Sequence, residues 1–407
     1  MLQGAQPRRA CITGCGAVSP IGNSADTFWN GLLAGRSGLA PIQAFDTHDV
    51  TVAVAGEVKD FHPETRLSAT ECEGLERVHQ FSLYAAREAI ADARLDLNRL
   101  DVTRVGVIVA TSLGGMLIGE AYQRQQPGSA DFAMRRLFDF PYYATANTLA
   151  RLLGVRGPTF SPSIACASGT QVVGMALEFV RLGYVDVCIV GGAETLCAFV
   201  VNGFNCLRAT TAESPRPFDV RRSGLQLGEG AAMLIIEEME QARRRGAAVD
   251  VEVVGTGLAG DATHMTAPAR DGAGAARAMR MALRDAGLAP AAVDFISAHG
   301  TGTVYNDAME GAAIASVFGE ATPRIPVNSI KGAIGHTLGA AGSFEAIMCA
   351  YVLRSGLIPA TVNYAQRDPA CRLDVVAGAP RRHAVQIAVS TSSAFAGNNA
   401  AIVLQRH

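Results

Sequence analysis

Short apolar runs alternate with amphipathic segments along most of the chain. The runs are rich in β-branched residues and are bounded by glycine or charged residues, as is typical of buried strands. In the first part of the chain such runs cover residues 10–12, 105–110, 185–190 and 231–237. Between them, apolar residues recur every three or four positions, which predicts helices over 76–93 and 170–182. The alternation of strands with helices predicts a layered α/β fold.

The same alternation starts again after the basic stretch at 243–246. We predict strands over 249–254, 293–297, 387–389 and 401–404, and helices over 275–286 and 342–354. We therefore expect two similar α/β halves, formed by residues 1–250 and 251–407. No long linker separates the halves, so we expect them to share one body. The segment 125–139 lacks periodicity, and we interpret it as an excursion near a partner surface.

Composition and charge narrow the class of protein. With 35 Lys and Arg against 37 Asp and Glu, the formal net charge is −2, which gives no electrostatic reason to expect nucleic acid or an acidic membrane surface as a partner. The longest uncharged stretch, 157–177, contains two prolines and several polar residues, so we expect no membrane span. The nine cysteines are odd in number and irregularly spaced, which favours free thiols and a reducing cytoplasm.

One cysteine stands in a turn of small residues directly before a predicted helix. Cys166 belongs to the uncharged segment 161–170, which leads into the helix expected from Thr170. The free N–H groups and the positive end of a helix N-terminus stabilise a thiolate, and small neighbours leave room for an acyl group. Taken alone, a buried packing cysteine is the more common explanation. The setting nevertheless makes Cys166 a candidate nucleophile.

Two further segments carry histidines among small residues. His299 follows a predicted strand and precedes Gly-Thr-Gly-Thr, in the kind of loop where α/β proteins place their sites. Lys331 and His336 lie in a run of small and apolar residues that has no other formal charge, and Glu345 follows this run. A single histidine is more often structural than catalytic. The candidate chemistry therefore depends on these segments meeting in the fold.

Two motifs of other protein classes are present only in part. Residues 255–260 match G-x-G-x-x-G after a predicted strand, but the next residues predict a loop rather than the helix that a dinucleotide site needs. Cys11 and Cys15 have no partner pair and no nearby histidine, so we expect no metal site.

Taken together, the three segments resemble a known family. Cys166 in A-C-A-S-G, His299 in A-H-G-T-G-T and His336 in K-G-x-x-G-H-x-x-G-A-A-G have the order and spacing of the β-ketoacyl-acyl-carrier-protein synthases, the decarboxylating condensing enzymes of the thiolase superfamily. The resemblance covers nearly the whole chain and includes the motifs at 12–16, 216–219, 228–230, 261–268 and 395–399. It implies a thiolase-like fold, in which two α/β halves form layers in the order α-β-α-β-α.

The resemblance implies a role for each residue of the set. Cys166 forms the acyl-enzyme, and His299 and His336 donate hydrogen bonds to the thioester oxyanion that develops as a malonyl group loses CO2. Lys331 and Glu345 support the histidines electrostatically. The remaining assignments are Thr301 and Thr303 for the phosphopantetheine arm, the backbone N–H groups of Cys166 and Phe395 for the oxyanion hole, Phe395 and Leu113 for the acyl substrate, and Arg135, Arg136 and Arg208 for docking of the carrier protein.

The same resemblance implies the reaction and the partners. His336 stands where the initiating enzymes that use acyl-coenzyme A have asparagine, so the chain resembles the elongating Cys-His-His subgroup. We expect a β-ketoacyl-[acyl-carrier-protein] synthase that condenses a cysteine-bound acyl chain with malonyl carrier protein. It has no bound cofactor, because the carrier protein supplies the phosphopantetheine arm. We expect a homodimer, or a heterodimer with a homologous chain-length factor.

Two departures from the family pattern keep alternatives open. The segment 71–80, often basic in the family, contains three glutamates and one arginine. Ala394 and Ala396 replace glycines of the bacterial fatty-acid elongases, which restricts the backbone of this loop. Both departures favour a ketosynthase dedicated to a polyketide, an aryl polyene or a signal lipid. A non-catalytic chain-length partner is a further alternative, but such partners lack the nucleophile that Cys166 provides.

Overall fold

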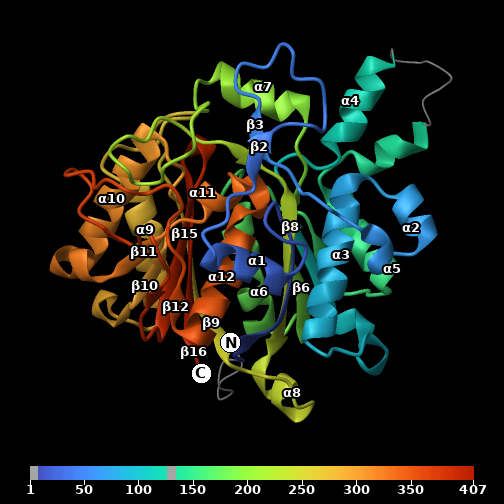
Figure 1. The fold of residues 1–407 in the computed structure, drawn as a ribbon. Helices are drawn as coiled ribbons and strands as arrows, with labels where there is room; N and C mark the ends of the chain where they lie inside the picture. Colours follow the sequence, from blue (N-terminus) through green and yellow to red (C-terminus); the bar gives the residue numbers. More distant parts are fainter. Residues whose placement is uncertain (1–7, 126–133) are drawn as a thin grey trace.

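The computed structural model describes residues 8–125 and 134–407 and shows strands alternating with helices in both halves of the chain (Figure 1). The N-terminal half contributes β1 (Ala10–Val18), β4 (Val105–Ala110), β5 (Thr159–Phe160), β6 (Val187–Glu194) and β8 (Gly230–Glu238) to a large sheet. The C-terminal half contributes β9 (Val251–Gly260), β10 (Phe295–Ser297), β11 (Pro326–Asn328), β13 (Asp374–Val375), β15 (Ile387–Ser393) and β16 (Asn398–Arg406). Smaller sheets are formed by β2 (Leu39–Pro41), β3 (Val54–Gly56) and β7 (Leu227–Gly228), and by β12 (Leu357–Ile358) and β14 (Arg381–Arg382).

The two halves of the large sheet have the same topology. The N-terminal strands lie in the order β5-β4-β6-β8-β1, and the C-terminal strands in the order β11-β10-β15-β16-β9, with β13 added at the outer edge. Numbered as they occur along each half, the strands follow the order 3-2-4-5-1 in both. The halves join where β1 pairs antiparallel with β9, with Ala10 opposite Val253 and Ile12 opposite Val251. The proposed division at residue 250 falls just before β9.

Helices form three layers around the two half-sheets (Figure 1). The outer N-terminal layer contains α3 (Arg77–Asp92) and α5 (Tyr143–Leu153), and the outer C-terminal layer contains α9 (Ala273–Asp285) and α10 (Val304–Phe318). Between the half-sheets lie α6 (Ser168–Arg181) and α12 (Ala341–Ser355), whose buried side chains share one core with strands of both halves. The other helices are α1 (Ala25–Leu33), α2 (Ala69–Gly74), α4 (Met116–Arg124), α7 (Ala198–Cys206), α8 (Met239–Arg244) and α11 (Lys331–Ile334). The layer order is therefore α-β-α-β-α, as expected.

Glycines let the first turns of the two central helices touch. A Cβ atom on Gly342, in the first turn of α12, would overlap the side chain and backbone of Thr170. A Cβ atom on Gly169, in the first turn of α6, would lie 2.8 Å from the carbonyl oxygen of Gly339. The loops that precede α6 and α12 are consequently held side by side, and these are the loops that carry Cys166 and His336.

The strand predicted over 249–254 continues to Gly260, so the glycines of the dinucleotide-like motif lie within β9 rather than in a phosphate-binding turn. Cβ atoms on Gly255 and Gly257 would overlap carbonyl oxygens of α9, which shows that these glycines allow the helix to pack closely on the strand. Of the aperiodic segment 125–139, residues 126–133 lie outside the described residues, and Met134–Asp139 form a 3-10 helix. Within the described ranges, no helix has both the length and the apolarity needed to cross a membrane.

Candidate active site

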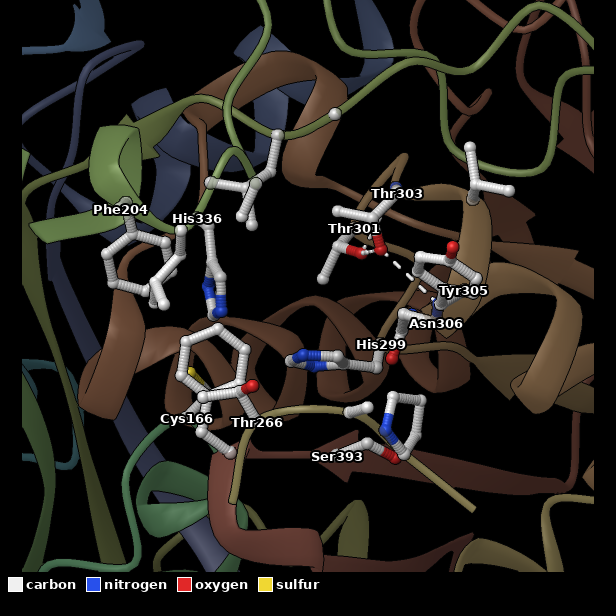
Figure 2. Close-up of a pocket in the computed structure, with 18 of the residues that line it drawn as sticks. Cys166, Phe204, Thr266, His299, Thr301, Thr303, Tyr305, Asn306, His336 and Ser393 are labelled. Atoms are coloured by element: carbon white, nitrogen blue, oxygen red, sulfur yellow. Dashed lines mark hydrogen bonds between the residues drawn. The ribbon is translucent and has the colours of Figure 1, made fainter. Parts of the chain in front are cut away.

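Cys166 sits in a tight turn two residues before α6. The preceding residue, Ala165, has a φ of +52°, a left-handed conformation that alanine adopts only under constraint. The Ser168 hydroxyl supplies that constraint, because it accepts a hydrogen bond from the backbone N–H of Ile164 (2.7 Å) and donates one to the carbonyl of Ala165 (2.6 Å). The turn directs the Cys166 side chain toward the cavity shown in Figure 2.

Burial of Cys166 acts against the thiolate that the sequence predicts. Burial raises the pKa of this thiol to about 12, and the positive charge of Lys331 opposes the rise only in part. Loss of solvation of the anion thus favours the protonated thiol and opposes the stabilisation of a thiolate expected from the helix N-terminus. For Cys166 to act as a nucleophile, a neighbouring group must therefore accept the thiol proton.

Two histidines face each other beside this thiol (Figure 2). The ring centroids of His299, which follows β10, and His336, which follows α11, are 5.2 Å apart with an interplanar angle of 82°. Burial lowers the pKa of both imidazoles well below the usual value, and the charge of Lys331 lowers it further. The backbone N–H of Leu338 donates to His336 Nδ1 (3.3 Å), which places the His336 proton on Nε2. Both rings are neutral, and His336 can donate a hydrogen bond through Nε2.

Lys331 is buried behind the histidines. Its Nζ donates to the carbonyl of His299 and to Oε1 of Glu345, each at 2.5 Å. The Ser392 hydroxyl donates to the other oxygen of Glu345 at 3.3 Å. One end of α12 thus fixes the lysine, and the lysine fixes the backbone of the His299 loop.

Two acids of α10 hold the His299 loop from the other side. Glu310 accepts hydrogen bonds from the backbone N–H of His299 (2.6 Å) and of Gly300 (2.8 Å), and Asp307 accepts one from the N–H of Thr301 (3.0 Å). Burial raises the pKa of Glu310 to about 7 and also raises the pKa of Asp307. The sequence interpretation missed both residues. Their spacing of three on a helix that directly follows Gly-Thr-Gly-Thr was the available signal.

The three segments form part of the wall of a cavity of about 320 Å³. Its lining includes Cys166, both histidines, Thr301, Thr303 and Phe395, all of which the sequence singled out. The hydroxyls of Thr301 and Thr303 are 3.0 Å apart. Phe395 stacks on Phe204 of α7, with ring centroids 5.5 Å apart, so a residue that the sequence interpretation missed forms part of the wall.

Comparison of the chain with models of protein families identifies its family. The model of the β-ketoacyl synthase N-terminal domain matches residues 8–242, and that of the C-terminal domain matches residues 251–365. The chain belongs to the β-ketoacyl synthase family. A relative named 3-oxoacyl-[acyl-carrier-protein] synthase 2, from Staphylococcus aureus strain COL, is 38% identical over 98% of this chain and 99% of its own. A protein of the same name from Synechocystis is 37% identical, with 99% of each chain covered.

Solved structures agree with this assignment. The ishigamide ketosynthase/chain length factor superposes with a TM-score of 0.94 at 38% identity, and the match covers 99% of this ketosynthase and 100% of that chain. The five-layered architecture is thus the thiolase-like fold of a ketosynthase, as the resemblance implied.

Some of the expected site residues do not line the cavity of this ketosynthase. Leu113 lies in the apolar cluster that contains Cys166 but not in the cavity wall. Arg135 and Arg136 are exposed on the short 3-10 helix at Met134–Asp139, whereas Arg208 lines the cavity itself. The structure thus separates the three arginines that were assigned together to carrier docking.

The acidic segment at 71–80 is also less acidic at the surface than its sequence implies. Glu71 forms a salt bridge with Arg87 at 2.7 Å, and Glu76 is buried as the N-cap of α3. Only Glu73 of the three glutamates is fully exposed. The departure from the basic family pattern therefore presents fewer charges to a partner than the sequence count suggests.

Proposed function

We propose that this ketosynthase is an elongating β-ketoacyl-[acyl-carrier-protein] synthase, with Cys166, His299 and His336 as its catalytic residues. The observation that carries the proposal is the pair of neutral imidazoles next to a buried thiol, in a cavity whose wall is largely apolar. The names of the relatives that match over nearly the whole chain support the same reaction.

In the first half-reaction, Cys166 Sγ attacks the carbonyl carbon of an acyl thioester on the carrier protein. Because the thiol is protonated at rest, its proton passes to a neutral imidazole of the pair and from there to the departing carrier sulfur. The bond between the carbonyl carbon and the carrier sulfur breaks, and a thioester forms on Cys166. Backbone N–H groups of Cys166 and Phe395 stabilise the tetrahedral oxyanion.

In the second half-reaction, the malonyl group of a second carrier loses CO2. The electron pair of the broken carbon–carbon bond becomes an enolate, and its oxygen accepts hydrogen bonds from His336 Nε2 and from the His299 ring. The enolate carbon then attacks the Cys166 thioester and expels the cysteine sulfur as a thiolate, which takes up a proton from solvent. Lys331 assists by keeping both imidazoles neutral.

The partners follow from this reaction. An acyl carrier protein delivers both acyl groups on its phosphopantetheine arm, and Thr301 and Thr303 hold the arm in the cavity. The ketosynthase acts as a dimer with a second copy or with a homologous chain-length factor. We place the reaction in the cytoplasm, where the nine free cysteines stay reduced.

One observation favours a dedicated pathway over general fatty-acid elongation as a second candidate. Ala396 has a φ of +63° in the loop that carries Phe395, so a glycine-type conformation is imposed on an alanine. Such a loop is stiffer than the glycine-containing loop of fatty-acid elongases. The likeness to the ishigamide ketosynthase/chain length factor supports this candidate too.

The proposal is tested by incubating the protein with a panel of acyl carrier proteins and measuring its intact mass, with Cys166→Ala as the control. We expect an acyl adduct on the wild type and none on the variant. The His336→Ala variant should still be acylated, because His299 remains to take the thiol proton, but should lose malonyl decarboxylation. Absence of an adduct with every carrier, or an adduct that survives in Cys166→Ala, would overturn the proposal.

A further inference from the structure

The cavity runs from the buried catalytic residues to the protein surface. At its inner end Cys166 and His299 are 6% and 2% exposed, whereas Leu207, Val304 and Tyr305 in its wall are 50%, 52% and 69% exposed. A ligand that reaches Cys166 from solvent therefore passes the exposed residues first. The outer part of the wall therefore contacts the part of the ligand that lies between its thioester and the solvent.

Arg208 is the one formally charged side chain in the described wall of this cavity. It is exposed, and no carboxylate of the described residues lies within ion-pairing distance of it. The arginines of the neighbouring segment 216–222 are each paired, Arg216 with Glu213, Arg221 with Asp219 and Arg222 with Asp368. Among these arginines, Arg208 alone offers its charge to a ligand.

The backbone at Arg208 is one that usually selects glycine. Arg208 has a φ of +53°, and it follows Leu207, the C-cap residue of α7, in a Schellman motif. In this motif the N–H of Arg208 donates to the carbonyl of Asn205 (2.9 Å), and the N–H of Ala209 donates to the carbonyl of Phe204 (3.3 Å). Glycine fits this position without the steric cost of a Cβ atom, so helix capping does not explain an arginine here.

Polar but uncharged groups accompany Arg208 in the outer wall. Ser223, Thr303 and Asn306 line the same cavity, and Thr303 caps α10 by accepting a hydrogen bond from the N–H of Asn306 (3.3 Å). Hydroxyl and amide donors beside a guanidinium are the usual ligands of a phosphate. No acidic side chain lines the described wall to repel an anion.

We propose that Arg208 binds the phosphate of the phosphopantetheine arm while the thioester end of the arm lies at Cys166. The inference rests on the proposed function, because it supposes that such an arm enters the cavity. The phosphodiester is the single charged group of the arm, and Arg208 is the single charged group of the wall. Arg208 therefore acts on the arm itself rather than on the surface of the carrier protein, in contrast to the docking role that the sequence suggested.

The test compares two small acyl donors that differ only in the phosphate, acyl-phosphopantetheine and acyl-pantetheine. The rate constant for acylation of Cys166 is followed by intact mass for the wild type and for Arg208→Gln. We expect kcat/KM for acyl-phosphopantetheine to fall about fivefold and that for acyl-pantetheine to stay unchanged, because an exposed ion pair has a modest strength. The difference should shrink as salt is raised. Arg99→Gln, at an exposed arginine outside the cavity, is the matched control.

A second variant separates phosphate binding from helix capping. Arg208→Gly suits the left-handed backbone, so it should unfold at the same or a higher temperature than the wild type while showing the same selective loss with acyl-phosphopantetheine. Equal losses with both donors, or a loss confined to donors on the intact carrier protein, would overturn the inference. If neither donor acylates the wild type and no acyl carrier protein does so either, the proposed function itself fails.

Discussion

The buried pair of Lys331 and Glu345 offers a test of how the site controls its protons. Replacing Lys331 by methionine leaves a carboxylate with no cation in a fully buried position, since Lys331 and Glu345 are 2% and 1% exposed. It also removes the donor to the His299 carbonyl. Replacing Glu345 by glutamine leaves the lysine as the unpaired charge.

Each single change should be strongly destabilising. Breaking a buried ion pair by removing one partner costs about 3–5 kcal/mol, which is a large part of a typical free energy of unfolding of about 5–15 kcal/mol. The Lys331→Met/Glu345→Gln double variant leaves no unpaired charge. We therefore expect its cost to be smaller than the sum of the two single costs by at least about 2 kcal/mol.

The assay is a double-mutant cycle by urea unfolding, combined with the pH dependence of acyl transfer. Because the charge of Lys331 lowers the pKa of both imidazoles, the double variant should have raised imidazole pKa values. The imidazoles must be neutral to accept the thiol proton, so the acid limb of the acyl-transfer profile should move to higher pH. Additive destabilisation together with an unmoved acid limb would refute the reasoning.

Three further predictions concern the loops around the cavity. Glu310→Gln removes an acceptor of the backbone N–H groups of His299 and Gly300. The rate of malonyl decarboxylation should therefore fall roughly tenfold, while a thermal melt should show that the variant is folded. An unchanged rate would argue against a positioning role for Glu310. The same variant should also lack the part of the pH dependence of the unfolding free energy that comes from titration of Glu310. The folded-state pKa of Glu310 is raised to about 7 from 4.5. The contribution of Glu310 to the unfolding free energy is therefore full below about pH 4.5 and is lost as pH rises toward 7. The unfolding free energy of the wild type should thus fall relative to Glu310→Gln across this range, by an amount on the order of 3 kcal/mol, and parallel curves would contradict the assignment. Finally, Ala396→Gly should raise the unfolding free energy by about 0.5–1 kcal/mol, because Ala396 has a left-handed backbone. Ala394→Gly, at a φ of −133°, should lower the unfolding free energy by a similar amount. Equal effects from both substitutions would show that the left-handed conformation of Ala396 stores no strain.

The sequence predicted strands best where burial alone decides the residue type. The strand β4, a continuous run of buried apolar residues, was located at its observed bounds of Val105–Ala110. The strand β1 was predicted over 10–12 only, because Gly14 and Gly16 interrupt the apolar run, although it extends to Val18. Cβ atoms on both glycines would overlap carbonyl oxygens of α3. Their presence reflects packing against a helix some seventy residues away, which no local pattern reveals.

The electrostatics of the candidate site also depend on distant segments, which a local sequence pattern does not reveal. Motifs identified Cys166, His299, Lys331, His336 and Glu345, and the structure brings all five together. The rise that burial causes in the pKa of the Cys166 thiol was not predicted, because a local pattern includes the helix N-terminus but not the burial that distant segments create. The anchoring acids were missed for a related reason. Their hydrogen-bond donors are backbone N–H groups, which leave no mark on side-chain chemistry in the sequence.

The placement of charge explains how a neutral site can handle anionic intermediates. Lys331 does not line the cavity; it lies behind His299, where its charge is balanced by Glu345 and its Nζ binds the His299 carbonyl. A cation beside Cys166, at the inner end of the cavity, would bind the malonyl carboxylate and oppose its loss as neutral CO2. From its position behind the loop, Lys331 keeps the imidazoles neutral. In the proposed mechanism the enolate oxygen, which appears only after CO2 has left, is then stabilised by hydrogen bonds from neutral donors, and this stabilisation favours the transition state over the bound substrate.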